Sequence, residues 1–556
     1  MAPRVSQSLL WRFWAWTTFL MVLFHHTDRA KAAPTPDYIQ SLGVVGGAWV
    51  EKYPTQKVHS LSGVYTLKIN GESVDVIDYS SSMTPYDYAH FGVGTSGAVR
   101  VEITKNGGGA VNSCAVSPWK LGIQASRSGS TCSFTVQEKH YLIVKIDDLR
   151  PLVLMMDDLE DKPDLNAANV YDVVKKYGAD DTGVHFSHEA MQKALDDACA
   201  AGGGTVYVPP GLYLVGNLVL PSNTRFHLAG GSVLRYMGYH GIYEKWFSKY
   251  DRGFTFWLRT AMHSSNVQIT GRGVIDGNGK ETFGVQSNYG VTILAPMVTS
   301  NFIYNGPIIR EASFWAFSMI SVTGAHISNL KILDRMDMGE NDGLDINQSK
   351  DVVVSRAISI AWDDPFSTKT WTKSAGGIFS RVPGNDPDDP AEPTPNQNVL
   401  FEDLVSWTGC WGAKVGQGHA QAHRNITFRS LTVFDAAVGI GVHHRYGTSP
   451  ADGVLFEDVD IERLSWSNDD KTTWLAVYVQ DSDRGVGEIK DVTVRNVRLW
   501  TMGKTPAIVQ GFSDQVKVTN VVLENIRPEG LGRPARTLEE INLTKVGFQG
   551  SLSLKS

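Results

Sequence analysis

The chain has 556 residues, a net charge of −7 and a moderate share of charged residues (20%). This length exceeds one ordinary hydrophobic core, so we expect two domains or one elongated repeat body. The composition excludes a disordered chain, and the mild acidity without basic blocks argues against nucleic acid and against a membrane surface as partners.

Residues 1–32 are typical of a secretory signal peptide. Arg4 gives a positive start, a mostly apolar run covers 9–24, and Ala-Lys-Ala at 30–32 is a small-x-small cleavage site. The alternative is a transmembrane anchor, but the run is short and Arg12 interrupts it. We therefore expect a secreted, extracellular protein.

Secretion permits disulfides, and the chain has four cysteines. Cys114 and Cys132 flank a polar stretch and are the pair we expect to be joined. Cys199 lies in an apparent helix and is expected to be a buried thiol, while Cys410 lies in a motif region described below. Sequons that permit glycosylation in a eukaryotic host stand at Asn347, Asn425 and Asn542.

Residues 33–165 are expected to form an N-terminal β-sandwich. Apolar and polar residues alternate in short runs, as at 63–69, 98–103 and 141–146, which is typical of half-buried antiparallel strands. Such a domain could bind substrate or shield the following body. Its unusual aromatic run at 86–91 is expected to pack against that body.

Residues 166–556 follow a different pattern, which predicts a parallel β-helix. Helical spacing at 186–201 ends at three glycines, and such a helix would cap the open end of a solenoid. A loose strand motif then recurs roughly every 25–40 residues, a period typical of solenoids and propellers. A propeller is the alternative, but its blades need more regular periods. Examples of the motif begin at Asn266, Asn398, Asn425, Gly453 and Asp491.

Several motifs here resemble glycoside hydrolase family 28, the polygalacturonases. The run 177–183 and the Gly-Gly-Thr-Val-Tyr-Val-Pro-Pro-Gly run at 203–211 are similar to the entry of pectin-degrading β-helix enzymes. Residues 266–279 (Asn-Val-Gln-Ile-Thr-Gly-Arg-Gly-Val-Ile-Asp-Gly-Asn-Gly) and Ser-Phe-Trp at 313–315 are also similar. The resemblance covers about 170–530 and implies a right-handed parallel β-helix and glycoside hydrolysis.

The resemblance also implies a catalytic centre. The family has an Asn-x-Asp-Gly turn followed one coil later by an Asp-Asp pair. Here Asn341-Asp342-Gly343 precedes Asp363-Asp364 by 21 residues, about one coil, so Asp342 should lie directly beneath the pair.

Breaking a glycosidic bond with inversion needs one carboxyl to protonate the leaving oxygen and another to activate water. When carboxyl groups lie close together, ionising one raises the pKa of its neighbour, so one can be ionised while the other stays protonated. By the resemblance, Asp363 would be the general acid, and Asp342 and Asp364 would position and deprotonate the water. The alternative is that these aspartates are corner residues or calcium ligands. No cofactor is implied.

The chain departs from the family at two motifs. Trp411 stands where a Gly-His-Gly motif has its histidine, and His443-x-Arg445 replaces an Arg-x-Lys pair that grips galacturonate; His444 lies beside it. Family 49, the dextranases and isopullulanases, shares the β-helix and three aspartates, carries an N-terminal sandwich and cuts neutral α-glucans. We therefore interpret the chain as a divergent member of this clan, acting on a pectin-type polymer or an α-glucan.

Aromatic and basic residues near the motifs indicate a sugar cleft, because aromatic faces stack on the C–H faces of sugars. The candidate substrate-binding residues are Trp362, Lys369, Trp411, Lys414, His443, His444 and Arg445, with Trp371 and Trp407 nearby. An insertion at 373–397 is expected to form a loop over the cleft.

Two other functions remain open from the sequence. A polysaccharide lyase on the same scaffold would need a basic residue and usually calcium, and the Asp-Asp pair disfavours it. A non-catalytic carbohydrate-binding β-helix would fit the altered motifs at Trp411 and His443. Oligomeric state and endo or exo action are not indicated.

Overall fold

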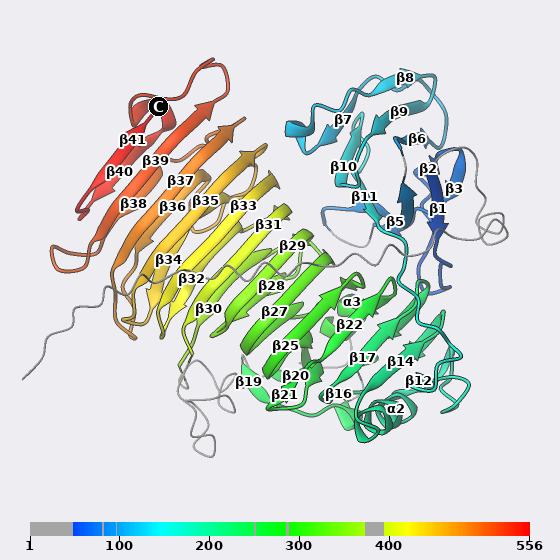
Figure 1. The fold of residues 1–556 in the computed structure, drawn as a ribbon. Coiled ribbons are helices and arrows are strands. Elements are labelled where there is room, and N and C mark those ends of the chain that lie inside the picture. The colour runs from blue at the N-terminus through cyan, green and yellow to red at the C-terminus, as the bar shows by residue number, and fades with distance from the viewer. Residues whose placement is uncertain are drawn as a thin grey trace, which may run out of the picture.

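The computed structural model describes residues 48–80, 83–95, 97–238, 240–249, 252–284, 289–372 and 394–556. The expected signal peptide and residues 373–393 of the insertion lie outside the described residues. A β-sandwich, blue to cyan in Figure 1, lies against a long stack of parallel strands, green to red. Within the described ranges, no helix has the length and apolar character needed to cross a membrane.

The N-terminal body consists of two facing sheets. Its strands pair antiparallel as expected, except that β5 and β11 run parallel. A disulfide between Cys114 on β7 and Cys132 on β9 joins the two sheets. One sheet contains β1 (Ala48–Lys52), β4 (Ile77–Tyr79), β5 (Tyr86–Thr95), β7 (Cys114–Ser117), β10 (Tyr141–Ile146) and β11 (Leu152–Asp157). The other contains β2 (Tyr65–Ile69), β3 (Glu72–Val74), β6 (Val99–Lys105), β8 (Ser126–Ser128) and β9 (Thr131–Val136), and η1 (Trp119–Leu121) follows β7.

Helix α2 (His188–Ala200) closes the first coil of the second body. Its apolar face, with Met191, Ala194, Leu195 and Ala198, is buried in the β-helix core, because i, i+3, i+4 and i+7 share one face. Cys199 lies on this helix as a free thiol. It is half-buried, so the prediction of a buried thiol was wrong.

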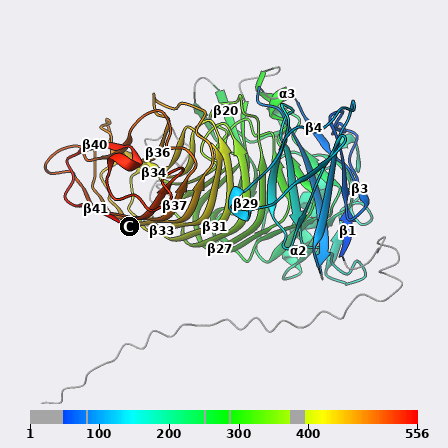
Figure 2. The same ribbon diagram turned by 90° about the horizontal axis from the view of Figure 1, so that it is seen from above.

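The second body is a right-handed parallel β-helix, whose coils stack along one axis in Figure 2. Each coil contributes strands to rows that pair with the coils above and below. One row contains β12 (Val170–Asp172), β14 (Gly204–Val208), β17 (Thr224–Leu228), β22 (Gln268–Gly271), β25 (Met297–Asn305), β27 (Phe317–Leu333), β29 (Lys350–Ala361), β31 (Asn396–Thr408), β33 (His423–Asp435), β35 (Ala451–Ile461), β37 (Ile489–Leu499), β39 (Val518–Pro528) and β41 (Leu552–Lys555).

A second row carries the candidate site. It contains β16 (Leu218–Leu220), β20 (Arg252–Thr260), β24 (Tyr289–Ala295), the first residues of β27, β28 (Leu344–Asn347), β30 (Phe366–Thr370), β32 (Trp411–His419), β34 (Val438–Tyr446), β36 (Thr473–Val479), β38 (Ala507–Gln510) and β40 (Leu543–Gly547). A third row in the first coils merges with the first row from β27 on: β13 (Thr182–Phe186), β15 (Gly211–Leu214), β18 (Ser232–Arg235), β23 (Val274–Asp276) and β26 (Ile308–Arg310). The remaining elements are η2 (His240–Ile242), β19 (Phe247–Lys249), β21 (Ser264–Ser265), α3 (Gly279–Gly284) and η3 (Glu539–Ile541).

Asparagine and aspartate mark the coil corners, as the repeat predicts. Asn398 and Asn425 adopt positive φ values of 55°, which asparagine tolerates better than most residues. Their side chains form a ladder in which Asn425 donates to Asn398 (3.0 Å) and Asn398 donates to Asp351 (2.8 Å). Asp351 is therefore a corner residue.

Buried polar and aromatic contacts fix the sandwich against the β-helix. Tyr86 and Tyr79 donate hydrogen bonds to the backbone oxygens of Asp334 (3.1 Å) and Leu333 (3.1 Å). Tyr86 also packs against Trp407, whose ring centroid lies 5.7 Å away. The aromatic run of β5 thus packs against the β-helix, as expected, and it does so just before the coil turn that carries Asp342.

Candidate active site

The three aspartates predicted from the sequence lie together at the turns that enter β28 and β30. Leu344 pairs with Phe366, a register offset of 22 residues. The Gly343 amide donates to the Asp364 carbonyl (2.9 Å), so Asp342 lies beneath Asp364. The coil is one residue longer than the spacing of 21 suggested, and Asn341 therefore lies beneath Asp363.

Asn341 and Gly343 shape this corner. The Asn341 side-chain oxygen accepts hydrogen bonds from the amides of Trp362 (3.0 Å) and Asp363 (3.2 Å), which fixes the backbone that carries the acid pair. A Cβ at position 343 would lie 2.2 Å from the Ser359 hydroxyl oxygen and 2.5 Å from the Pro365 carbonyl oxygen. Only glycine fits there without displacing the neighbouring coil.

Two buried lysines lie among the aspartates. The Lys369 ammonium contacts Asp342, lies 2.9 and 3.0 Å from the two oxygens of Asp345, and lies 3.6 Å from Asp364. The Lys414 ammonium contacts Asp364 directly. Lys369 and Lys414 are only 4% and 2% exposed, so both are committed to the carboxylates, although the sequence suggested them as substrate-binding residues.

The environments of Asp363 and Asp364 push their pKa values in opposite directions. Burial raises the pKa of Asp363, and the adjacent Asp364 raises it further. Burial also opposes ionisation of Asp364, but Lys414 and Lys369 outweigh burial and lower its pKa. Asp363 is half-buried whereas Asp364 is 1% exposed. The carboxyl whose pKa is raised is thus the less buried of the two.

Asp342 and Asp345 complete a cluster of four carboxylates around two ammonium groups. Burial raises the pKa of Asp342, and its three acidic neighbours add to this against the opposing effect of Lys369. Burial likewise raises the pKa of Asp345, which is fully buried and contacts the hydroxyl of Ser367. The cluster carries more acids than cations, which favours the protonated form of its carboxyls.

The free thiol of Cys410 lies against the acid pair. Its sulfur and one carboxylate oxygen from each of Asp363 and Asp364 all lie within 4.8 Å of one another. Burial, then Asp363 and Asp364, raise the pKa of the thiol well above its usual value, so it stays protonated and can donate. These atoms could hold a metal ion by their spacing, but Lys414 already neutralises Asp364.

Aromatic rings from successive coils stack beside the aspartates. Trp411 on β32, His443 on β34 and Tyr478 on β36 are nearly parallel, with centroids 5.7 Å apart for Trp411 and His443 and 4.4 Å for His443 and Tyr478. Trp362, half-buried beside Asp363, meets Trp466 edge-on at 5.3 Å. Trp411 and His443 are buried at 2% exposure, whereas Trp362, Trp466 and Tyr478 are half-buried and can contact a sugar.

The remaining sequence candidates divide between the two faces of β34. Arg445 shares the outward face with His443, lies over the Tyr446 ring (4.8 Å) and donates to Gln417 (3.3 Å). His444 points the other way, is fully buried and stacks on His419 at 4.1 Å. Because strand side chains alternate, adjacent residues cannot both face the cleft, so a substrate-binding role for His444 was wrong.

Sequence reasoning missed Asp345, Cys410 and Tyr478. Asp345 lies between buried Leu344 and Ile346 on β28, so alternation could have placed it outward beside the other acids. Cys410 and Tyr478 carried no such signal, because their positions depend on which coils become neighbours. Trp407 packs between the two bodies and does not line the site.

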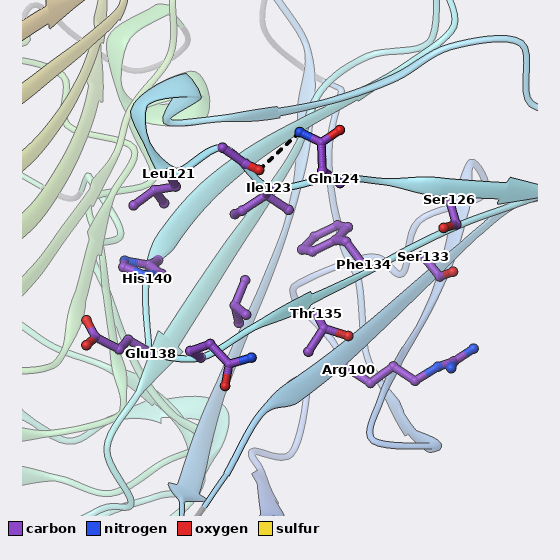
Figure 3. A pocket seen from close by; sticks show the side chains of 13 residues that line it. Arg100, Leu121, Ile123, Gln124, Ser126, Ser133, Phe134, Thr135, Glu138 and His140 are labelled. Carbon is purple, nitrogen blue, oxygen red and sulfur yellow. Dashed lines mark hydrogen bonds between the residues drawn. The ribbon is translucent and has the colours of Figure 1, made fainter.

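A cavity away from these acids lies on the sandwich. It has a volume of about 520 Å³ and is lined by residues of the η1–β8 segment and β9, with Glu138 and His140 at one end (Figure 3). Glu138 is the one carboxylate in its lining, so the cavity lacks the acid pair that glycosidic hydrolysis needs.

Residues 171–458 match a family model described as rhamnogalacturonase A/epimerase, pectate lyase-like. Rhamnogalacturonase A of Emericella nidulans is 23% identical over 309 residues, 55% of this chain and 53% of that protein. Endo-xylogalacturonan hydrolase A of Aspergillus tubingensis is 25% identical over 279 residues, 45% of this chain and 62% of that protein. The chain thus spans between half and two thirds of the length of these relatives.

Two solved structures share the fold over almost the whole chain. The family 28 exopolygalacturonase of Yersinia enterocolitica is 14% identical, with a TM-score of 0.51 and coverage of 90% of this chain and 96% of that chain. Dex49A from Penicillium minioluteum is 13% identical, with a TM-score of 0.57 and coverage of 89% and 96%. At these identities the likeness concerns the fold.

Proposed function

Because the chain belongs to the rhamnogalacturonase A/epimerase, pectate lyase-like family, we propose that it is an inverting glycoside hydrolase that cleaves α-glycosidic bonds of a pectin-type polysaccharide. One observation carries the proposal. Two adjacent carboxyls, Asp363 and Asp364, have pKa values shifted in opposite directions by their surroundings. Glycosidic hydrolysis requires one carboxyl that stays protonated as the acid and one that is ionised as the base, and opposite pKa shifts favour this division.

In the proposed reaction, Asp363 is the general acid. It gives its proton to the glycosidic oxygen as the bond from that oxygen to the anomeric carbon breaks. Asp364 accepts a proton from a water whose oxygen forms the new bond on the opposite face, and Asp342 accepts the water's second hydrogen bond. Inversion follows because the water attacks the anomeric carbon on the face opposite the leaving group.

An acidic polymer is favoured over a neutral one by the cation on the outward face of β34. Arg445 keeps its guanidinium beside the ring stack of Trp411, His443 and Tyr478. A guanidinium binds a carboxylate in a bidentate fork, which suits a galacturonate residue. The names of the curated relatives also point to galacturonan backbones. We assign Trp362, which is half-buried beside Asp363, to a sugar face.

A neutral α-glucan is the second candidate. Dex49A shares the fold over 89% of this chain, including the part that precedes the β-helix. The buried lysines do not separate the candidates, because they contact carboxylates of the protein itself. The substrate panel below distinguishes them.

We further propose that the chain is secreted, with the signal peptide at 1–32, the sandwich domain at 33–165 and the catalytic domain at 166–556. Of the three sequons, Asn425 is exposed and suits a glycan. Asn347 is fully buried and donates to Ser318 (3.0 Å), so it is not an acceptor in the folded protein.

Product analysis on polygalacturonate, rhamnogalacturonan, xylogalacturonan, dextran and pullulan tests the proposal. Wild type is compared with Asp363→Asn and with Asp351→Asn, a matched change at an exposed corner. We expect hydrolysis of one acidic polymer, a loss of at least about 10³-fold in Asp363→Asn, and normal rates in Asp351→Asn. Proton NMR of fresh product should show inversion at the anomeric carbon.

Three results would contradict parts of this proposal. Hydrolysis of dextran alone would transfer the assignment to neutral α-glucans. Unsaturated products absorbing in the ultraviolet would indicate a lyase. Retained glycan binding without turnover of any polymer would indicate a non-catalytic β-helix.

A further inference from the structure

Lys414 occupies a buried position in the β-helix from which its ammonium reaches Asp364. It lies on β32, in register with Ser367 of the coil below and Gly441 of the coil above. Its ammonium contacts Asp364, and its side chain is only 2% exposed. The sequence suggested a hydroxyl or carboxylate binder, and the carboxylate that Lys414 contacts in the folded chain is one of the protein's own.

Trp411 forms the cover over this lysine. The Lys414 nitrogen lies 5.5 Å from the centre of the Trp411 ring, within the range of a cation–π contact. The ring is held in place by His443 on one side and by the absence of a side chain at Gly441, where a Cβ would lie 2.9 Å from a ring carbon. The ammonium is therefore shielded from water, which strengthens its attraction to Asp364.

Lys369 cannot replace Lys414. It contacts Asp342 and Asp345 and lies 3.6 Å from Asp364, so its single charge is divided among three carboxylates. Of the two cations in reach of Asp364, Lys414 lies closer than Lys369. Removing it would leave a buried carboxylate whose burial and acidic neighbours favour protonation.

We propose that Lys414 is a positioning residue, which keeps Asp364 ionised and aimed at the attacking water while Trp411 shields the pair from solvent. This inference rests on the proposed hydrolase function. It assigns Lys414 a role in the proton transfer to Asp364 and none in substrate binding.

The assignment can be tested by steady-state kinetics on the polymer that wild type hydrolyses. The variants are Lys414→Met and Lys414→Arg, and the control is Lys350→Met, because Lys350 is an exposed lysine on β29. For Lys414→Met we expect kcat to fall at least about 100-fold with KM within about threefold of wild type. The acidic limb of its kcat/KM profile should move upward by one pH unit or more, because Asp364 then holds its proton to higher pH. Lys414→Arg should recover part of kcat, and Lys350→Met should match wild type.

Two further variants keep the test valid if Lys414→Met folds poorly. In Lys414→Ala, ethylammonium should restore kcat, because a small cation can fill the space that the side chain leaves. In Asp364→Asn/Lys414→Met, both charges of the pair are absent, and we expect the rate to equal that of Asp364→Asn alone.

The outcomes separate the two proposals. A raised KM with unchanged kcat, an unmoved acidic limb, or a double variant much slower than Asp364→Asn would overturn the role of Lys414 while leaving the hydrolase intact. Failure of wild type to hydrolyse any polymer would overturn the proposed function itself.

Discussion

The carboxylate of Asp157, at the end of β11 in the sandwich, lies against the ammonium of Lys331 in the β-helix, and both side chains are fully buried. His90 (2.9 Å), Tyr141 (2.7 Å) and Arg272 (3.5 Å) surround the same carboxylate. The attraction of Lys331 and its neighbours outweighs burial and lowers the pKa of Asp157 well below its ordinary value. The two bodies are therefore joined through a charged centre.

Asp157→Asn should destabilise the whole protein. It leaves Lys331 and Arg272 buried without their counter-charge, a change that typically costs about 3–5 kcal/mol. Thermal unfolding should show a lower Tm, and limited proteolysis should separate the sandwich from the β-helix. Asp158→Asn, at the neighbouring exposed carboxylate, is the control. An unchanged Tm in Asp157→Asn would mean that the pair contributes nothing to the junction.

The pH dependence of hydrolysis should be bell-shaped. Asp364 must be ionised, and its pKa is lowered, so activity is lost only when the pH falls through that lowered value. Asp363 must be protonated, and its pKa is raised, so activity is lost when the pH rises through that raised value. Profiles of kcat/KM measure both limbs. A rate that rises steadily into the alkaline range would contradict these roles.

Stability should fall as the pH drops below about 6.5 because of a buried histidine cluster. His419 stacks on His444 (4.1 Å) and lies 4.5 Å from His423, and all three are buried. Burial lowers the pKa of His423 to about 3 and that of His444 to about 4. The unfolded chain, with a histidine pKa near 6.5, then binds protons that the folded chain does not.

The loss should begin near pH 6.5 and continue towards pH 4, with each histidine contributing on the order of 2 kcal/mol at pH 5. Denaturant unfolding of wild type, His423→Gln and the exposed control His326→Gln at pH 7 and pH 5 measures it. His423→Gln should lose less stability between the two pH values than wild type does. Equal losses in all three proteins would refute the role of the cluster.

Removing the disulfide should lower the stability of the sandwich and leave the catalytic rate unchanged. Cys114 and Cys132 are 18 residues apart, and closing a loop of that length stabilises a fold by about 3 kcal/mol in the chain-entropy model. Cys114→Ser/Cys132→Ser should therefore unfold at lower denaturant concentration with an unchanged kcat. Cys199→Ser serves as the control. A large loss of kcat would show that the sandwich contributes directly to catalysis.

The sequence by itself determined the local elements and the positions of the candidate acids. Period-two alternation predicted β2, helical spacing predicted α2, and recurrent asparagines predicted the corners, because each depends on residues a few positions apart. The Asn341-Asp342-Gly343 turn and the Asp363-Asp364 pair were recognisable for the same reason. Their assembly at one corner followed from the coil length, to within one residue.

Only the tertiary structure decided what surrounds those acids. Lys414 and Cys410 reach the pair from a coil 47 residues further on in register, and the sequence does not state which coils become neighbours. For the same reason, the sequence suggested Lys369 and Lys414 as sugar-binding residues and predicted that His444 faces the cleft. Charge and burial arise from packing between distant segments, so the opposite pKa shifts of Asp363 and Asp364 could be derived only once the coils were stacked.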